Sequence, residues 1–549
     1  MHWSLTAPYT VAEFVAMAVI VAAALCTPRP VRRAVERAGR ALLRATSRRP
    51  ALAVFLLALA WNLLPLAFFV PVPSVHDEFS YLLMADTFRH GRLSMPSHPL
   101  WRSFETFHVI QEPTYASKYP PFQGLVLAAG VLLFGAPILA VKIVAALDAV
   151  GVWWALRGWM PPRWAVLGAV VFALQFGGFS YWSQSLFGGV GATLGGALVL
   201  GAYPRLVARP RVRHGVLLGV GLAILATTRP YEGLVLAVPI AVALLRVARG
   251  WRDGSAVALL PAGLLAAAAV AGIAAYNRSV TGDPLTFPYQ VYTERYGYAQ
   301  PFRFQAPRRQ VHIAQPVMQK FVDEFERGQY QASAAEHWRP LLRFYVAPLL
   351  PAPLVLLPCL WRHRRSRFPI LLGVLALLAS MLTTFLLPHY VAPFSALLLL
   401  LVVQCLRLLF ITRWRGRRAG RSLGPAVLRA WFYAWMAISL VAGGAQAHAQ
   451  SLHPWYMVRR DIERELDGQP GDHLVFVHYE KAHSPHEEWV YNRADIDAAR
   501  VVWAREVDPV HDAALRRYYC GRTVWLVRPD GPVPIGPEKL RPPACDSPE

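Results

Sequence analysis

Two adjacent carboxylates, Asp77 and Glu78, stand in the stretch VHDEFSY, just after the apolar run at 51–71. Ionisable side chains at the edge of a membrane are costly, so they are usually either solvated or functional. A carboxylate in such a partly desolvated place can act as a general base on a hydroxyl group within hydrogen-bond reach. The alternative is that both side chains simply end a helix at the headgroup level.

Two cationic positions accompany this acidic pair. Lys118 precedes Tyr119 in the stretch KYPP, and Arg229 interrupts an apolar region together with Glu232 in TTRPYEGL. The guanidinium group offers a bidentate fork that suits phosphate oxygens. Arg229 is therefore a candidate phosphate-binding residue, and a local Arg229–Glu232 ion pair is the structural alternative.

Aromatic and histidine side chains supply further candidates. His389 lies in a tight turn, PHY, between two apolar runs, and the long segment 277–340 is rich in tyrosine. Long loops in compact proteins are often functional, and Tyr289 and Tyr292 could pack against a sugar. The alternative is an aromatic belt that anchors these segments at the membrane interface.

The composition determines what must position these residues. Of the 549 residues 55% are hydrophobic and 16% are charged, which is typical of a polytopic membrane protein. The net charge of +23 comes from arginine clusters between apolar runs, so we expect no nucleic-acid partner. Windows of about 20 apolar residues predict about twelve transmembrane helices. They lie near 9–27, 51–71, 138–156, 164–182, 186–204, 214–228, 233–249, 255–276, 341–361, 368–387, 390–411 and 426–447.

The arginine clusters predict the orientation of the chain. The segment 28–50 alone carries eight Arg against one Glu. If every cluster is cytoplasmic, an even number of spans separates each from the next, provided that the short apolar piece 122–135 does not cross. This topology predicts a multi-pass protein of the inner (plasma) membrane whose candidate site and C-terminal tail are extracytoplasmic.

Three regions follow from this topology. Residues 1–50 form an extra transmembrane helix and a basic cytoplasmic loop. Residues 51–450 form the helical membrane domain, with outer loops 72–137 and 277–340. Residues 451–549 form a small extracytoplasmic α/β domain, in which HLVFVHYE, ARVVWARE and TVWLVRPDG read as buried strands and PVHDAALRRYY as a helix.

Two side-chain groups in this tail have open interpretations. Cys520 and Cys545 could form a disulfide outside the cytoplasm. The stretch VHYEKAHSPHEEW is rich in His and Glu, and we interpret it as a solvated loop rather than a metal site.

The motif of Asp77, Glu78, Tyr81, Gly91 and the following KYPP resembles the GT-C glycosyltransferases. The branch it resembles contains protein O-mannosyltransferases and the lipid A aminoarabinose transferase, and the resemblance covers roughly residues 51–400. It implies a GT-C-like helical fold, an acidic residue of the first outer loop as catalytic base, and a donor sugar carried on a polyprenyl phosphate or diphosphate.

The chain departs from the family at YWSQSLFGG. Many relatives carry an acidic residue there, whereas this chain has Ser183, Gln184 and Ser185. In the oligosaccharyltransferase branch those acidic residues help to hold a divalent metal, so their absence argues against that branch and against a metal. We expect no cofactor, and a divalent metal is the minor alternative.

Taken together, these features predict an integral-membrane glycosyltransferase that moves a sugar from a polyprenyl-phosphate donor to a hydroxyl of a glycan, lipid or protein. Asp77 is the expected general base, Glu78 positions the acceptor or shares that role, and Arg229 and Lys118 neutralise the leaving phosphate. The alternatives are a transporter or flippase, although no repeated halves are visible in the sequence, and a non-catalytic scaffold in envelope polysaccharide assembly.

Overall fold

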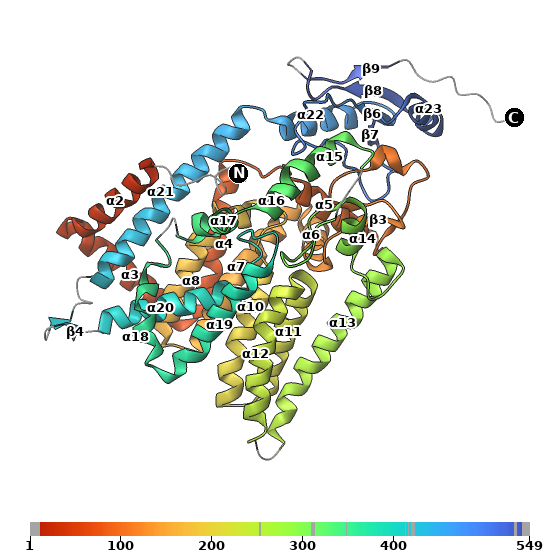
Figure 1. The fold of residues 1–549 in the computed structure, drawn as a ribbon. Helices are drawn as coiled ribbons and strands as arrows, with labels where there is room; N and C mark the ends of the chain where they lie inside the picture. Colours follow the sequence, from red (N-terminus) through yellow and green to blue (C-terminus); the bar gives the residue numbers. More distant parts are fainter. Residues whose placement is uncertain are drawn as a thin grey trace.

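The chain folds into a bundle of membrane helices with a small mixed sheet at one end (Figure 1). The computed structural model describes residues 11–251, 254–308, 313–346, 349–411, 413–414, 417–418, 423–531 and 535–540. Within these ranges the predicted class, a helical membrane protein with a C-terminal α/β region, is confirmed.

Among the described residues, seven helical segments are long and apolar enough to cross a membrane, or eight if the bent pair α2–α3 forms one span. The seven are α4 with η1 (Pro50–Ala67), α7 (Pro137–Arg157), α12 (Pro230–Ala248), η3 with α13 (Ser255–Thr281), α19 (Arg364–Leu382), η6 with α20 (Ala392–Ile411) and α21 (Leu423–Ser451). The bent pair consists of α2 (Val11–Leu25) and the basic helix α3 (Arg29–Arg48).

Shorter apolar helices occupy the remaining predicted spans. They are α8 (Pro162–Phe176), α10 (Ala192–Ala208), α11 (Val212–Thr228) and the stretch Ala352–Trp361, to which α6 (Pro121–Phe134) adds the piece that we expected not to cross. Proline at the first position and Gly135 with φ 69° after the last residue set the ends of α6. Its 14 residues span about 21 Å, which is shorter than the hydrocarbon core.

The predicted span 341–361 differs most from the structure. Helix α17 (Ala334–Val346) ends early, and a separate short helical stretch, Ala352–Trp361, follows it. Pro351 and Pro353 lack the N–H groups that a continuous helix would need there. Composition alone therefore predicted a longer helix than the prolines allow.

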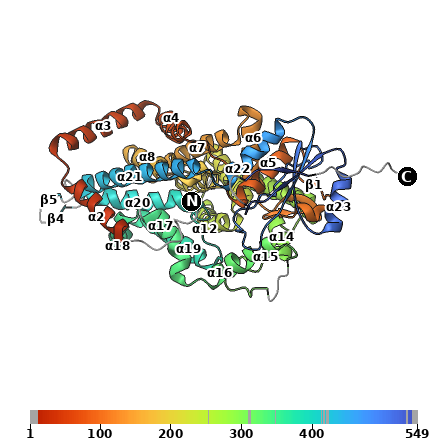
Figure 2. The same ribbon diagram turned by 90° about the horizontal axis from the view of Figure 1, so that it is seen from above.

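The segments 72–137 and 277–340 carry short elements around the carboxylate pair. They are α5 (His76–Arg89), β1 (Met95–Pro96), η2 (Trp101–Phe104), β2 (Val109–Ile110), β3 (Thr114–Ser117), α14 (Pro288–Tyr296), α15 (Pro316–Phe321), the π-helical turn Val322–Glu326 and α16 (Arg327–Gln331). Figure 2 shows α5 beside the C-terminal strands, whereas α2 and α3 lie on the far side of the bundle.

The C-terminal region contains the predicted strands and helix. After α22 (Trp455–Asp467) come β6 (His473–Val477), β7 (Val501–Arg505), α23 (Pro509–Tyr518), β8 (Thr523–Val527) and β9 (Glu538–Lys539). The sheet order is β7-β6-β8-β9, with β6 parallel to β7 and β8, and with β9 antiparallel to β8. The first two strands are buried along their whole length, as is typical of parallel sheets covered on both faces.

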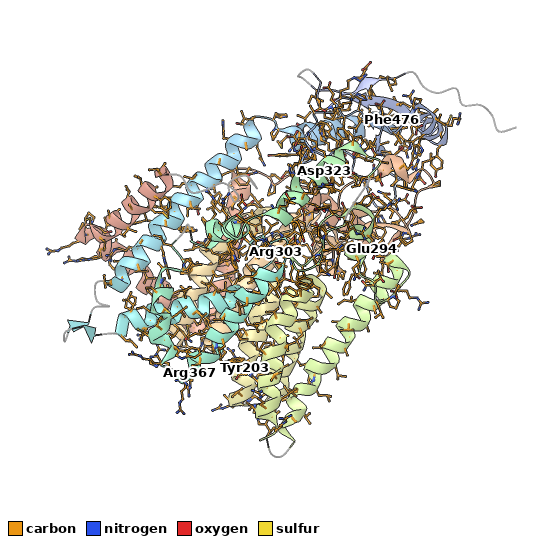
Figure 3. All side chains as sticks on the ribbon, in the orientation of Figure 1. Tyr203, Glu294, Arg303, Asp323, Arg367 and Phe476 are labelled. Carbon is orange, nitrogen blue, oxygen red and sulfur yellow. The ribbon has the colours of Figure 1, made fainter. Side chains whose placement is uncertain are left out.

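This sheet shares a hydrophobic core with the segment that follows the carboxylates. Leu83 and Val109 belong to the same buried cluster as Leu474, Phe476 and Leu526. Figure 3 labels Phe476 at this end of the molecule and Arg367 at the opposite end. The first outer segment and the C-terminal region are therefore packed as one body.

The His- and Glu-rich stretch of the tail differs from the predicted solvated loop. Glu488 is completely buried and forms an ion pair with the equally buried Arg505, and it also accepts a hydrogen bond from Tyr479. His483 is 2% exposed and contacts Asp530 at 2.9 Å. These charges are buried because each has a partner, which the sequence does not reveal.

Cys520 is disulfide-bonded. Cys545 lies outside the described residues, so its pairing with Cys520 stays a prediction.

We predict that Glu488→Ala lowers the free energy of unfolding by about 3–5 kcal/mol, because it leaves the Arg505 guanidinium buried without its counter-charge. The apparent Tm of purified protein in detergent measures this effect. Glu465→Ala, at an exposed position of α22, serves as the control and should change the Tm little. Equal Tm values for both variants would contradict the structural role of the pair.

Candidate active site

Asp77 lies in the first turn of α5, where the backbone N–H groups of a helix favour a negative charge. Its Oδ1 accepts a hydrogen bond of 2.5 Å from the Tyr119 hydroxyl, and its side chain is 28% exposed. The Tyr119 ring stacks on the Tyr81 ring, with centroids 4.5 Å apart. The carboxylate is thus held in one orientation and still reaches solvent.

Glu78 has a different environment, although it is the next residue. It is 4% exposed, and its Oε2 accepts hydrogen bonds from the backbone N–H groups of Ser74 at 2.8 Å and Val75 at 3.3 Å. Its Oε1 accepts from the Leu186 N–H at 3.0 Å. Both oxygens are engaged with the backbone, so Glu78 ties the start of α5 to the turn before α10.

His108 is a site residue that the sequence analysis missed. Its Nε2 lies 3.8 Å from the Asp77 Oδ2, and its backbone has φ 62°. No spacing or motif marks this histidine, because both its left-handed backbone and its contact with α5 appear only in the folded chain. The sequence offered one weak signal, namely that His108 is a titratable residue about ten positions before the KYPP motif.

Lys118 is buried beside two tyrosine rings. Its Nζ lies 4.5 Å from the centroid of Tyr292 and 5.3 Å from that of Tyr119. Burial lowers the pKa of Lys118 to about 8, while the negative charges of Asp77 and Glu326 oppose this shift. An ammonium group in this place is poised to meet an anion.

Arg229 lies at the turn between α11 and α12. Its guanidinium is 4.1 Å from the centroid of the Tyr390 ring. Among the described residues no salt bridge joins Arg229 to Glu232, but the two charges act on each other, so the structural alternative stays open. The charges of Arg229 and Asp77 both act on Tyr81 and on Tyr390, which places the two charged groups around the same aromatic pair.

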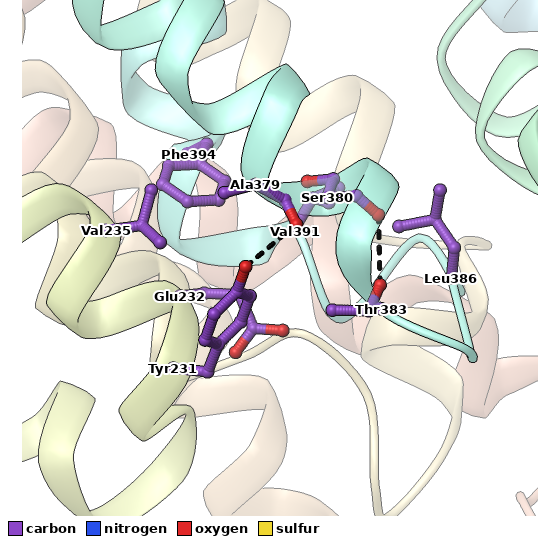
Figure 4. Close-up of a pocket in the computed structure, with 9 residues that line it drawn as sticks. All are labelled: Tyr231, Glu232, Val235, Ala379, Ser380, Thr383, Leu386, Val391 and Phe394. Atoms are coloured by element: carbon purple, nitrogen blue, oxygen red, sulfur yellow. Dashed lines mark hydrogen bonds between the residues drawn. The ribbon is translucent and has the colours of Figure 1, made fainter. Parts of the chain in front are cut away.

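Glu232 and His389 are both buried side chains. Glu232 lines a narrow pocket between α12 and α19, where Tyr231 donates a 2.9 Å hydrogen bond to the Ala379 carbonyl (Figure 4). His389 is 3% exposed, and its Nδ1 is 3.1 Å from the Tyr181 hydroxyl. His389 is therefore next to the Tyr390–Arg229 contact but is enclosed by protein.

A second pocket adjoins Lys118. Apolar and aromatic side chains from α6, α13 and α14 line it, with Tyr289 among them, and Lys118 stands at its edge. The structure thus brings Asp77, Lys118, Tyr119 and Tyr292 into contact and places Tyr289 in the adjoining pocket. In the part of the chain described, no group of three or more His, Cys, Asp or Glu is placed to hold a metal ion.

Similarity to solved structures was found along most of the chain. ArnT from Cupriavidus metallidurans in the apo state is 14% identical over 87% of this chain and 92% of that chain, with a TM-score of 0.49. ArnT bound to undecaprenyl phosphate gives 14% identity, 88% and 93% coverage and a TM-score of 0.49. The oligosaccharyltransferase AglB from Archaeoglobus fulgidus, in complex with an inhibitory peptide and a dolichol-phosphate, is 12% identical over 88% of this chain and 70% of that chain, with a TM-score of 0.36.

No family model matches the chain, and no curated protein sequence matches it. The likeness to ArnT and AglB is thus one of structure, at 12–14% sequence identity.

Burial raises the pKa of Glu78 from 4.5 to about 7, against the opposing effect of its three backbone hydrogen bonds. Since the folded-state pKa exceeds the unfolded value, this group favours folding fully below pH 4.5, and its contribution disappears as the pH rises through about 7. We predict that the Tm of Glu78→Gln falls less between these pH values than the Tm of the wild type.

Thermal unfolding in detergent at a series of pH values tests this expectation. Glu112→Gln is the matched control, because the Glu112 side chain is 48% exposed in the same outer segment, and its Tm should follow that of the wild type. Parallel curves for wild type and Glu78→Gln would show that folding does not raise the pKa of Glu78.

Proposed function

We propose that this chain is an integral-membrane glycosyltransferase that moves a sugar from a polyprenyl-phosphate donor to an acceptor hydroxyl, with Asp77 as general base. One observation carries the proposal: a solvent-accessible carboxylate, fixed by Tyr119, stands beside the cations Lys118 and Arg229 at the end of a membrane helix bundle. A base beside anion-binding groups is what the displacement of a phosphate by a hydroxyl requires.

The two oxygens of Asp77 have separate tasks in this reaction. Tyr119 holds Oδ1, and Oδ2 is left to take the proton of the acceptor hydroxyl. The acceptor oxygen attacks the anomeric carbon as the bond from that carbon to the phosphate oxygen breaks, and the electron pair leaves with the phosphate. Attack opposite to the leaving group inverts the configuration of the sugar.

Lys118 and Arg229 stabilise the charge that develops on the leaving phosphate. The Arg229 guanidinium lies over the Tyr390 ring, which fixes its plane before the substrate arrives. Lys118 lines a small pocket together with apolar and aromatic side chains, so its charge lies beside apolar surface, as suits a phosphate carried on a hydrocarbon chain. Glu78, whose oxygens hold the backbone, positions Asp77 rather than the acceptor.

The distribution of arginine supports an extracytoplasmic site. Arg367 lies at the end of the molecule opposite to Phe476 and the C-terminal sheet (Figure 3). Arginine-rich ends of membrane helices face the cytoplasm. The carboxylates share a packed body with that sheet, so the proposed reaction takes place on the outer face of the plasma membrane.

We predict that Asp77→Asn reduces transfer by about 10²–10⁴-fold, because the amide cannot accept the proton. The measurement is release of free polyprenyl phosphate from a panel of radiolabelled polyprenyl-phosphate sugars, with cell-envelope extract as the source of acceptor. Glu112→Gln, a carboxylate of the same outer segment, should retain wild-type release. Full activity of Asp77→Asn would remove Asp77 from the mechanism, and no release by the wild type from any donor would favour transport or a scaffold role.

We predict that Arg229→Ala raises the KM for the donor about tenfold or more, because it removes a charge-assisted contact to phosphate. Arg295→Ala is the matched control, since Arg295 also lies over an aromatic ring, that of Trp101, at 4.3 Å. An unchanged KM and kcat for Arg229→Ala would reduce this residue to a structural role.

A further inference from the structure

The backbone of His108 has a conformation that a histidine seldom adopts. Its φ is 62°, in the left-handed region that favours glycine. Two hydrogen bonds hold its carbonyl there, from the Ser80 hydroxyl at 2.6 Å and from the Lys118 N–H at 3.2 Å. Such conformations cluster at functional sites, where the surrounding structure enforces them. Both donors stand close in sequence to proposed site residues, Asp77 and Tyr119.

The side chain that this backbone presents faces Asp77. The His108 Nε2 is 3.8 Å from the Oδ2 of Asp77, the oxygen that Tyr119 does not bind. This distance is longer than a hydrogen bond, as is common for catalytic pairs before the substrate is bound. A small movement of the carboxylate would bring the two groups into contact.

The surroundings of His108 keep its imidazole neutral. Burial lowers its pKa well below 6.5, and the positive charges of Lys118 and His76 lower it further. The other titratable groups around the ring are Asp77, Tyr119 and Tyr292, at ring distances of 5.8 Å and 5.7 Å for the two tyrosines. Among the described residues the buried Nδ1 has no hydrogen-bond partner. A neutral imidazole beside the Asp77 carboxylate can accept a proton from it.

We infer that His108 accepts the proton that Asp77 removes from the acceptor hydroxyl, and this inference rests on the proposed transferase function. The hydroxyl proton moves to Oδ2 of Asp77 as the glycosidic bond forms and the bond to phosphate breaks. It then moves to Nε2 of His108, which regenerates the carboxylate and leaves an imidazolium. The imidazolium returns the proton to water through the 11% of its side chain that is exposed.

This step explains how Asp77 is ready for the next turnover while products still occupy the site. A protonated Asp77 covered by product could not exchange with bulk water directly. Burial and the charges of Lys118 and His76 oppose the imidazolium, so it is short-lived, and the restored negative charge of Asp77 is the neighbouring group that favours it. His108 is thus assigned a role in proton transfer that a neutral hydrogen-bonding side chain could not replace.

The test uses His108→Gly in the full-length protein with exogenous imidazole. Glycine adopts φ 62° without strain, so the variant should fold, and it leaves a space of the size of an imidazole ring. We expect the rate of polyprenyl phosphate release to fall about 10²-fold. Millimolar imidazole should bring this rate back to at least about a tenth of the wild-type rate. His108→Ala provides a second variant with the same space.

Two controls separate proton transfer from structure. His108→Asn tolerates the left-handed backbone but offers no basic nitrogen, so it should be slow and should not respond to imidazole. His453 also has a positive φ, 50°, and an exposed ring that contacts Asp461. His453→Gly should have wild-type activity with and without imidazole.

Each outcome has one meaning. A wild type that releases no polyprenyl phosphate refutes the proposed function itself. With an active wild type, full activity of His108→Gly would overturn the inference about His108 alone. A slow but monodisperse His108→Gly and His108→Ala that imidazole does not restore would also overturn it, because the loss would then be structural. Restoration in both variants, but not in His108→Asn, would support it.

Discussion

The candidate site depends on a buried carboxylate whose two oxygens are both engaged with the backbone. Glu78 accepts hydrogen bonds from Ser74 and Val75 before α5 and from Leu186 before α10, so one side chain joins two segments that are about a hundred residues apart. Burying a charge is costly unless hydrogen bonds compensate, and three backbone donors offset part of that cost here. Because Asp77 is the neighbouring residue, its position relative to Tyr119 follows from this junction.

Much of the architecture could be predicted from the sequence, because its signals are local. Long apolar runs predict α7, α12 and α20, since the bilayer sets the necessary length. Buried β-branched runs predict β6 and β8. Asp77 and Arg229 could be nominated because charged groups are rare in apolar surroundings, and Lys118 because it belongs to the KYPP motif.

The remaining features depend on contacts between distant parts of the chain. The neighbours of His108 come from α5, from α14 and from the residues that follow β3, and its left-handed backbone is a property of the fold. Asp77 and Glu78 have different environments because Tyr119 contacts the former and Leu186 the latter. No spacing in the sequence connects these partners to the two carboxylates. The burial of Glu488 could not be predicted without knowing that Arg505 lies beside it. The break in the predicted span 341–361 could have been predicted from its prolines.

The shared core of α5 and the C-terminal sheet has a consequence for biosynthesis. Tyr491 stacks on Phe79 with ring centroids 4.2 Å apart and lies 2.8 Å from the His76 ring nitrogen, although 415 positions separate Tyr491 from His76. The ribosome therefore makes the helix that carries the carboxylates early, but the surface that completes it emerges last. A nascent or truncated chain has the helix that carries the carboxylates without its C-terminal partner, so only a fully translated polypeptide acquires the assembled site.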